Sequence, residues 1–196
     1  GPGTYCESVT IERSVVLTGD RGDVNVAGPG AGAPVMDGTG LSGAAAFELS
    51  AGVSDVTIEG FEVRNYGPDD NTGADGIVAW NSGTSDVTVR DNWFHHLGWD
   101  AVLVGNEGQG VHANWLVTRN RADHWYAYGL ELTNTTTSSI THNELSNPTS
   151  DWSFGVLVYA YVEGARTVSA SASAFSISAR WWKVSLRSAG PPCSRA

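Results

Sequence analysis

Short runs in which apolar residues alternate with polar or small residues recur along the chain. The strongest copies are VSDVTIEGFEVRN (53–65), TSDVTVRDNWFHH (84–96), NWLVTRNRADH (114–124) and TSSITHNELSN (137–147). Their matching apolar positions are Ile58, Val89, Val117 and Ile140, which lie 31, 28 and 23 residues apart. Alternation with a period of two is the pattern of a β-strand with one buried face. The four copies therefore predict strands that occupy equivalent places in a repeating unit.

A second set of alternating runs precedes these copies. It consists of AAFELS (45–50), DGIVAW (75–80), DAVLVG (100–105), YGLELT (128–133) and FGVLVY (154–159). Residues that favour turns separate the runs, and no stretch shows the apolar spacing of an amphipathic helix. Self-similarity at roughly 20–30 residues without helices predicts an all-β solenoid, a single-stranded parallel β-helix of about five to seven coils stacked about 4.8 Å apart. A β-sandwich is the alternative fold, but its strands do not repeat their own sequence.

Asn92, Asn120 and Asn143 follow the apolar positions at the same place in three copies. If the coils stack, these residues form a ladder at one turn of the solenoid. Asn tolerates a left-handed backbone and forms hydrogen bonds with its own kind in the next coil. We therefore expect the ladder to be structural.

Charge is distributed unevenly along the chain. The net charge is −10, but residues 1–163 hold all 21 acidic residues and only six arginines, a balance of −15. An acidic, nearly lysine-free surface repels phosphate backbones and argues against a nucleic-acid partner. A high-salt environment and a GC-rich genome both favour this composition. No stretch approaches the roughly 18 consecutive apolar residues of a membrane span, so no span is expected.

Residues 164–196 depart from the repeat. They contain five basic residues and no acidic residue. Two interpretations stay open, a segment in which Trp181 and Trp182 help to cap the open end of the solenoid, or an out-of-frame or truncated C-terminus. The sequence thus predicts a β-helix domain over residues 1–163, truncated at its N-terminus, and an atypical basic tail over 164–196.

Cys6 and Cys193 lie at opposite ends of the sequence. In an elongated solenoid the two ends are far apart, whereas a disulfide needs Cα atoms within about 7 Å. Both cysteines are therefore expected to be free thiols.

Several motifs carry a resemblance to a known group. The opening GPGTYCESVTIERSVVLTG, the repeated V-x-I-x-x-N steps and the strand starts Gly76-Ile77, Gly129-Leu130 and Gly155-Val156 resemble the pectate-lyase-like right-handed parallel β-helix superfamily. The resemblance covers about residues 1–160 and implies a right-handed helix. It indicates the activity poorly, because the superfamily includes lyases, hydrolases, epimerases and non-enzymatic proteins. Within it, the chain is similar to generic secreted β-helix repeat proteins, including the NosD type associated with copper-enzyme maturation.

Stacking makes the aligned positions of successive coils neighbours in space. The positions four residues after the ladder asparagines are His96, His124 and Asn147, and those eight residues after are Asp100, Tyr128 and Asp151. The strand starts give a second alignment, of Asp75, Asp100, Tyr128 and Phe154. The two alignments agree for two coils and disagree for the last.

In this register His96 and His124 lie one coil apart, and so do Asp75 and Asp100. Two carboxylates at that distance raise one pKa, which provides an acid/base pair near neutral pH. A histidine beside Tyr128 supplies a base and an acid for attack at the carbon next to a uronate carboxylate, an arrangement similar to β-helix uronate lyases and epimerases. The candidate catalytic residues are His96, His124, Tyr128 and Asp100. The structural alternative is that the aspartates cap turn amides and the histidines bond along the ladder.

Trp99 and Trp125 flank the same region and are the candidates for stacking on sugar faces. Arg119 and Arg121 flank Asn120 and are the candidates for binding a substrate carboxylate. Strand alternation sends one residue of such a pair inward or away from the site. No matched basic residue neutralises a uronate here, which weakens the lyase hypothesis.

The loop PDDNTGADG (68–76) suggests a calcium site. It places Asp69, Asn71 and Asp75 at alternate positions, and Ca²⁺ prefers several hard oxygen ligands. The bidentate Glu of a helical calcium hand is missing, and a solvated acidic loop is the alternative. Ca²⁺ is the one candidate cofactor. Only two of the five histidines are expected to be neighbours, which is too few for zinc or copper.

Together these patterns predict an extracellular or cell-surface β-helix that binds an extended polysaccharide along its long face. Evenly spaced polar and aromatic groups on a stacked sheet match a polymer better than a small metabolite. The enzymatic hypothesis is a uronate-directed lyase or epimerase. The competing class is a non-catalytic surface or adhesion module, NosD-like proteins included. We expect a monomer or part of a longer chain.

Overall fold

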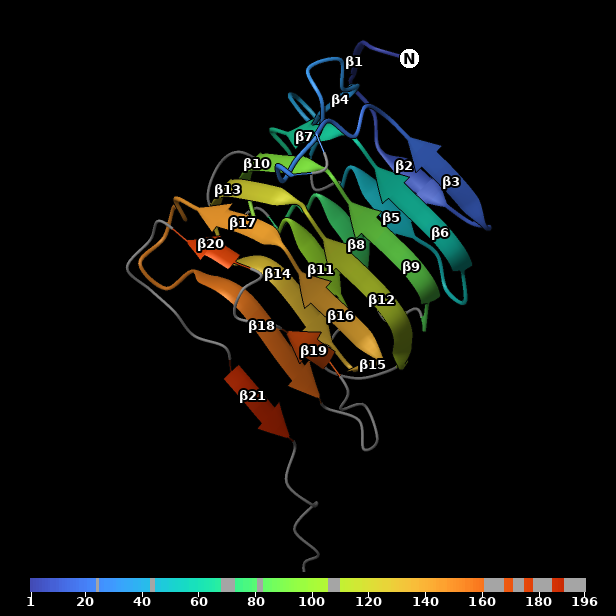
Figure 1. Ribbon diagram of the computed structural model, residues 1–196, viewed down its shortest axis with the longest axis vertical. Helices are drawn as coiled ribbons and strands as arrows, with labels where there is room; N and C mark the ends of the chain where they lie inside the picture. The colour runs from blue at the N-terminus through green and yellow to red at the C-terminus, as the bar shows by residue number, and fades with distance from the viewer. Residues whose placement is uncertain are drawn as a thin grey trace, which may run out of the picture.

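The chain folds into three parallel β-sheets wound as a solenoid (Figure 1). The computed structural model describes residues 1–196 except 24, 43–44, 68–72, 81–82, 106–109, 161–167, 171–174, 178–184 and 189–196, and it describes side chains as far as Ala160. Within the described residues, every strand pairing is parallel and joins one coil to the next. The predicted all-β parallel solenoid is thus confirmed.

Each sheet takes one strand from each successive coil. Sheet A consists of β1 (Thr4–Tyr5), β4 (Val35–Asp37), β7 (Glu62–Arg64), β10 (Trp93–Leu97), β13 (Arg121–Trp125), β17 (Asn143–Ser146) and β20 (Phe175–Ile177). Sheet B consists of β2 (Val9–Ile11), β5 (Phe47–Leu49), β8 (Ile77–Ala79), β11 (Val102–Val104), β14 (Tyr128–Thr133), β18 (Phe154–Ala160) and β21 (Ser185–Ser188). Sheet C consists of β3 (Val15–Thr18), β6 (Ser54–Glu59), β9 (Ser85–Arg90), β12 (His112–Thr118), β16 (Ser138–Thr141) and β19 (Val168–Ala170), and β15 (Thr135–Thr136) also pairs with β12.

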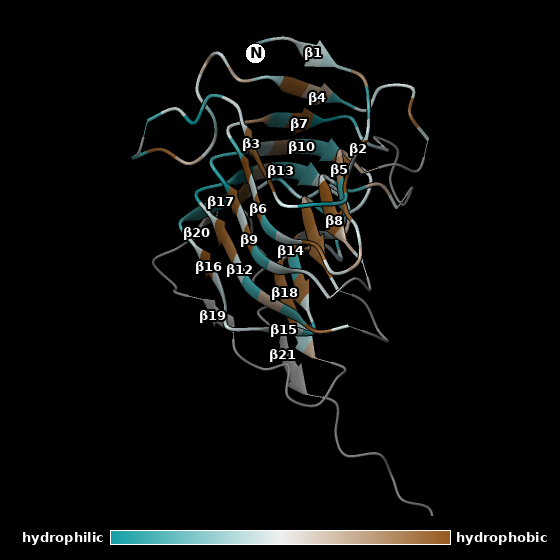
Figure 2. Ribbon diagram, turned by 90° about the vertical axis from the view of Figure 1, so that its right-hand side faces the viewer, coloured by the Kyte–Doolittle hydropathy of each residue, from teal (hydrophilic) through white to brown (hydrophobic). Residues whose placement is uncertain are grey.

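The four apolar positions of the first repeat form one file inside the solenoid, as predicted. They are Ile58, Val89, Val117 and Ile140. In the register of sheet C each of them pairs with the next, and all four side chains are fully buried. Figure 2 shows the resulting alternation of hydrophobic and hydrophilic residues along strands such as β9 and β12. Since each buried aliphatic side chain contributes roughly 1.5–3 kcal/mol, the file is a main source of stability.

The strand starts of sheet B need glycine because adjacent coils approach closely there. A Cβ atom at Gly76 would lie 2.5 Å from the carbonyl oxygen of Ala101 and 2.6 Å from the ring of Phe94. At Gly129 it would lie 2.7 Å from the carbonyl oxygen of Gly155. The Gly-Ile and Gly-Leu steps seen in the sequence are thus steric requirements of the stack.

The predicted asparagine ladder occupies the turn between sheets C and A. The Oδ1 of Asn120 accepts hydrogen bonds from the backbone N and the Nδ2 of Asn92, both at 3.1 Å. The Oδ1 of Asn143 accepts the same pair from Asn120, at 2.9 and 3.1 Å. All three side chains are buried, so the ladder satisfies polar groups that have no access to water. Its structural role is confirmed.

The left-handed backbone of this turn lies one residue before the ladder. Asp91, Arg119 and His142 have φ angles of 57°, 57° and 54°. The ladder asparagines therefore contribute hydrogen bonds, whereas their predecessors make the bend. The expectation that the asparagines themselves adopt the left-handed conformation is wrong.

Strands continue into the basic tail. The backbones of β19, β20 and β21 pair in register with β16, β17 and β18. The sequence repeat did not predict these strands. Cys6 is exposed and free, as predicted, while Cys193 lies outside the described residues. Among the described residues, no helix has the length and apolar character needed to cross a membrane.

Candidate functional site

Polar and aromatic side chains gather on the outer face of sheet A. Strand register aligns Glu62, Trp93 and Arg121 in one outward file. The next outward file contains Arg64, His95 and Asp123. The residues between these files, Val63, Phe94 and Ala122, point into the core. We refer to the six outward residues, together with His96 and His124, as the sheet A face.

His96 and His124 are neighbours, as the alignment predicted. Their imidazole rings are stacked in parallel, with centroids 4.6 Å apart and an interplanar angle of 3°. Each is the next-to-last residue of its sheet A strand and has a left-handed backbone, φ 54°. Asn65 and Asn147 have a similar left-handed backbone in the flanking coils. A bend at the same place in each coil projects these side chains in one file.

Hydrogen bonds fix the tautomer of His96. The Nε2 of His95 lies 3.2 Å from Oε1 of Glu62, a carboxylate oxygen that only accepts, so His95 carries its proton on Nε2. Burial lowers the pKa of His95, against the effect of Glu62, and keeps the ring neutral. The Nδ1 of His95 is therefore an acceptor, and the Nδ1 of His96, 2.7 Å away, must donate to it. The Nε2 of His96 is left with a lone pair.

His124 has the same tautomer as His96, with its proton on Nδ1, but a different hydrogen-bond partner. Its Nδ1 lies 2.5 Å from Oδ1 of Asp123 and donates to that carboxylate. The other carboxylate oxygen of Asp123 accepts from the indole Nε1 of Trp93 at 2.8 Å. The side chain of His124 is 43% exposed. The two stacked imidazoles thus each engage Nδ1 with a partner, and each neutral ring keeps a lone pair on Nε2 as a hydrogen-bond or proton acceptor.

A chain of ionic contacts supports the face from the N-terminal side. The guanidinium of Arg64 lies 3.0 Å from Asp37 and 2.8 Å from Glu62. Partial burial opposes ionisation of Asp37, but hydrogen bonds from Thr39, Asn65 and Arg64 outweigh it and hold the pKa of Asp37 well below its usual range. Asp37 and Arg64 therefore remain charged and held in contact.

The structure separates the two predicted substrate-binding arginines. Arg121 lies on the sheet A face, where its guanidinium stacks 4.8 Å from the ring centroid of Trp93 and 3.5 Å from Asp123. Arg119 instead lies in the turn between sheets C and A, 2.6 Å from the carboxylate of Asp91. Only Arg121 belongs to the site.

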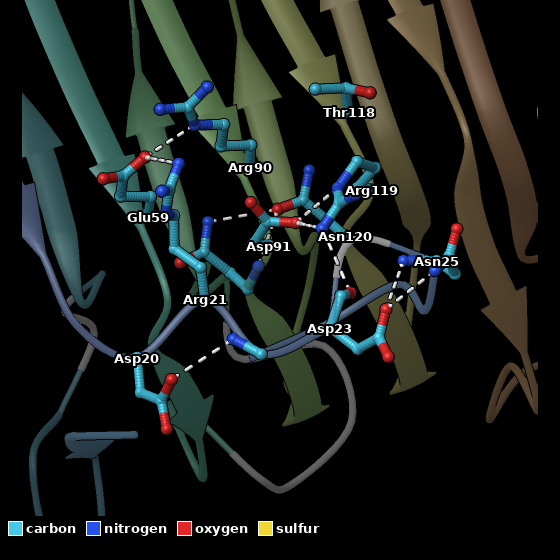
Figure 3. A network of polar contacts seen from close by, with 12 residues as sticks. Asp20, Arg21, Asp23, Asn25, Glu59, Arg90, Asp91, Thr118, Arg119 and Asn120 are labelled. Atoms are coloured by element: carbon cyan, nitrogen blue, oxygen red, sulfur yellow. Dashed lines mark hydrogen bonds and ion pairs between the residues drawn. The ribbon is translucent and has the colours of Figure 1, made fainter. Parts of the chain in front are cut away.

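Arg119 binds an N-terminal segment through hydrogen bonds. We call this segment, residues 20–33, the strap; its residue 24 is not described. The guanidinium of Arg119 donates to the carbonyl of Asp23 at 3.3 Å, and its own carbonyl accepts from the backbone N of Gly28 at 2.9 Å. Figure 3 shows this network, in which Arg21 also reaches Glu59 at 3.8 Å. Arg119 therefore has a structural role in this network, and substrate binding by Arg119 stays a prediction.

Asp75 and Asp100 stack at the start of sheet B, as the strand starts predicted. Oδ1 of Asp75 accepts from the backbone N of Asp100 at 2.9 Å, and Oδ1 of Asp100 accepts from the backbone N of Tyr128 at 2.8 Å. Burial raises the pKa of Asp75 to about 7, with Glu131 adding to the effect. The pKa of Asp100 is raised by burial first, and then by Asp75 and Glu131. The direction of the shift is as expected, but desolvation is its main cause.

These aspartates cap turns, which was the structural alternative. Asp100 is fully buried, so its carboxylate cannot touch a polymer on the surface. Tyr128 lies on β14 with its ring stacked on Phe154, 5.8 Å between centroids, and so belongs to sheet B. Tyr128 pairs with Phe154 in the register, which decides between the two alignments and rejects Asp151.

The two tryptophans predicted to stack on sugars, Trp99 and Trp125, differ in their exposure. Trp125 is 2% exposed and donates from Nε1 to the carbonyl of Phe154 at 3.2 Å. It is a core residue and cannot stack on a sugar. Trp99 is half-buried in the turn between sheets A and B, beside Tyr126 and Trp152.

The predicted calcium loop is only partly described. Asp69 and Asn71 lie outside the described residues, and Asp75 uses its Oδ1 in the turn. No group of three or more potential ligands for a metal ion is found among the residues that the structure describes. The calcium hypothesis stays a prediction.

Sequence reasoning overlooked Trp93, His95 and Asp123. The signal was present, because these residues alternate with the buried Phe94 and Ala122 in NWFHH and NRADH. The alignment of the coils compared only the asparagine and histidine positions, and it passed over the outward residues between them.

Comparison with known protein families, with curated proteins and with solved structures finds no match to this chain. Any function must therefore be argued from the geometry of the site.

Proposed function

We propose that the protein binds an extended polysaccharide along the sheet A face. The observation that carries the proposal is the stacked pair His96 and His124, whose rings come from adjacent coils and whose Nδ1 atoms are engaged, which leaves Nε2 of each neutral ring as an acceptor. Sugar hydroxyls donate hydrogen bonds, and a polymer offers them at intervals along its length. Arg121 adds exposed donors on the same face, where its side chain is 48% exposed.

The charges of the face favour a neutral polysaccharide over a polyuronate. Asp37, Glu62 and Asp123 lie on or beside the face, and both of its arginines, Arg64 and Arg121, already contact these carboxylates. The net charge of −10 adds a general repulsion towards polyanions. The proposal includes an extracellular or cell-surface location, where such polymers occur. Membership of the pectate-lyase-like superfamily is part of the same proposal and is supported by the asparagine ladder.

Binding is tested by titration calorimetry with neutral polysaccharides (galactomannan, hydroxyethyl cellulose, dextran) and acidic ones (polygalacturonate, alginate). The informative variant is His96→Asn with His124→Asn, because Asn65 and Asn147 already hold the same left-handed backbone in this file. The double variant should lose at least tenfold in affinity. His142→Asn is the matched control, since His142 has the same backbone, φ 54°, in a different turn. Equal affinity for all three proteins would refute the proposal.

A second candidate function is proton abstraction by His124. The pairing of its Nδ1 with Asp123 at 2.5 Å orients the ring and leaves Nε2 as a general base. In a uronate lyase this base would take the proton next to the carboxylate, and the electron pair would form the double bond as the glycosidic oxygen leaves. Absorbance from unsaturated products on polygalacturonate or alginate tests a lyase, and hydrogen–deuterium exchange into the sugar tests an epimerase. No activity in either assay leaves a binding protein.

A further inference from the structure

Three aromatic rings meet at the turn between sheets A and B. Trp99, Tyr126 and Trp152 follow β10, β13 and β17, so they come from three successive coils. Ring centroids are 5.9 Å apart for Trp99 and Tyr126, 5.9 Å for Trp99 and Trp152, and 4.9 Å for Tyr126 and Trp152. Tyr126 and Trp152 meet edge to face, at 85°. We call these three residues the aromatic platform.

Backbone contacts hold the platform rigid. The backbone N of Tyr126 donates to the carbonyl of Trp99 at 3.2 Å. The hydroxyl of Ser153 donates to the carbonyl of Tyr126 at 2.5 Å, and the backbone N of Trp152 donates to the hydroxyl of Ser150 at 3.4 Å. The rings are thus oriented before any ligand arrives, which lowers the entropic cost of binding.

One ring of the platform, that of Trp152, is exposed. Trp152 is 42% exposed, whereas Trp115 and Trp125 are buried in the core. The rings of Trp99 and Tyr126, which come from the two preceding coils, pack against that of Trp152. This arrangement resembles a support for a ligand more than a part of the core.

The size of the exposed surface selects the kind of ligand. Trp152 is the one exposed large hydrophobic residue at this corner among the described residues. A stable protein interface needs roughly 1,000 Å² of buried surface, far more than one indole offers. A single pyranose ring, with apolar C–H groups on one face and hydroxyls at its rim, matches an indole in size and polarity.

We infer that the aromatic platform is a separate sugar subsite, on which one pyranose unit of the polysaccharide stacks against Trp152. The inference rests on the proposed function. Trp99 lies three residues after His96, and Tyr126 two residues after His124, so at most about 10 Å of backbone separates the platform from the histidine pair. One oligosaccharide therefore contacts both, and Trp99 packs against Trp152.

The test is titration of Trp152→Ala with whichever of galactomannan, hydroxyethyl cellulose or dextran the unmodified protein binds most tightly. Loss of one stacked ring should weaken binding about three- to tenfold. Trp80→Ala is the matched control, because Trp80 is 49% exposed but follows β8 at the corner between sheets B and C. Its affinity should be unchanged. Trp152→Phe, which keeps a ring and the packing with Tyr126, should retain most of the affinity.

The outcomes separate the platform from the histidine pair. If the His96→Asn/His124→Asn variant loses binding while Trp152→Ala binds like Trp80→Ala, the platform is not a subsite and the proposed function stands. If both variants weaken binding and the Phe variant restores it, the inference holds. If no polysaccharide binds the unmodified protein, the proposed function and the inference both fail. Melting curves show whether Trp152→Ala is folded, and an unfolded variant leaves the Phe variant and Trp80→Ala to decide.

Discussion

His112 is a titratable residue that the fold holds in its neutral form. The side chain is fully buried on β12, and its Nδ1 accepts hydrogen bonds from the hydroxyl and the backbone N of Thr84, at 2.8 and 3.2 Å. Trp115 donates to the same hydroxyl at 3.1 Å. Burial lowers the pKa of His112 to about 4, with the carbonyl of Trp80 acting in the opposite direction. His112 is therefore neutral in the folded protein until the pH falls to about 4.

Stability should consequently fall as the pH drops from about 6.5 to about 4, because the unfolded state binds a proton at His112 that the folded state excludes. The contribution is complete above this window and amounts to at most about 3 kcal/mol. Urea unfolding of His112→Asn, which keeps an acceptor for Thr84, should show a shallower pH dependence over this range. An unchanged slope would contradict the assignment.

For Asp75 the contribution to folding stability changes with pH in the opposite direction. Its raised pKa of about 7 means that the folded state holds a proton which the unfolded state, with a pKa of 3.8, releases earlier. This contribution to stability is present below pH 4 and is lost as the pH rises through 7. Asp75→Asn keeps an oxygen for the backbone N of Asp100 and removes the charge, so it should be more stable than the unmodified protein at pH 8.

Melting temperatures at pH 5 and pH 8 provide the measurement for Asp75. The exposed Asp151→Asn serves as the control for a change of net charge and should show no such difference. If Asp75→Asn gains no stability at pH 8 relative to pH 5, the carboxyl is not held protonated.

At the scale of the element, the asparagine ladder connects the coils at one turn. Asn120 is its central member, because it donates to Asn143 and to the carbonyl of Val89 and accepts from Asn92. Asn120→Ala leaves several buried polar groups without partners, each at a cost of about 1–3 kcal/mol. We expect a loss of about 3 kcal/mol or more in chemical unfolding. Asn25→Ala in the exposed strap is the control and should change stability little; equal losses would contradict the ladder's role.

Strand register was the part of the fold that the sequence predicted best. The file from Ile58 to Ile140 and the pairing of His96 with His124 followed from aligning repeats, because a parallel stack converts equal position into proximity. The prediction failed at the bends. A left-handed residue at His124 resets the alternation, so the next residue, Trp125, turns inward and pairs with the buried Leu97. Proximity to the histidines in the sequence therefore did not place Trp125 on the surface.

The candidate site was only half predicted for a related reason. His96 and His124 are neighbours as expected, and Arg121 lies on the same face. The partners that set their chemistry, Glu62 and Asp123, depend on side-chain geometry that an alignment does not contain. Asp100 was predicted in the right place and given the wrong role, because sequence does not show that burial removes it from solvent.

For the whole molecule, the proposal predicts how binding responds to salt. A neutral polysaccharide binds through hydrogen bonds and stacking contacts, and its binding releases few ions from the protein surface. Its affinity should therefore change less than about twofold between about 0.05 and 0.5 M NaCl. A polyuronate, repelled by the acidic surface, should bind more tightly at high salt than at low salt. Calorimetry at the two salt concentrations distinguishes the cases, and a steep loss of neutral-glycan affinity with salt would contradict the neutral-ligand assignment.

The account depends most on the two Nε2 lone pairs that the sheet A face presents. Long-range ¹H–¹⁵N NMR of the histidine side chains reports which ring nitrogen carries the proton. For His96 and His124 we predict protons on Nδ1, and a shift of both Nε2 resonances, with His142 unaffected, when the bound polysaccharide is added. Protons on Nε2, or resonances that stay unmoved by a saturating ligand, would contradict the account.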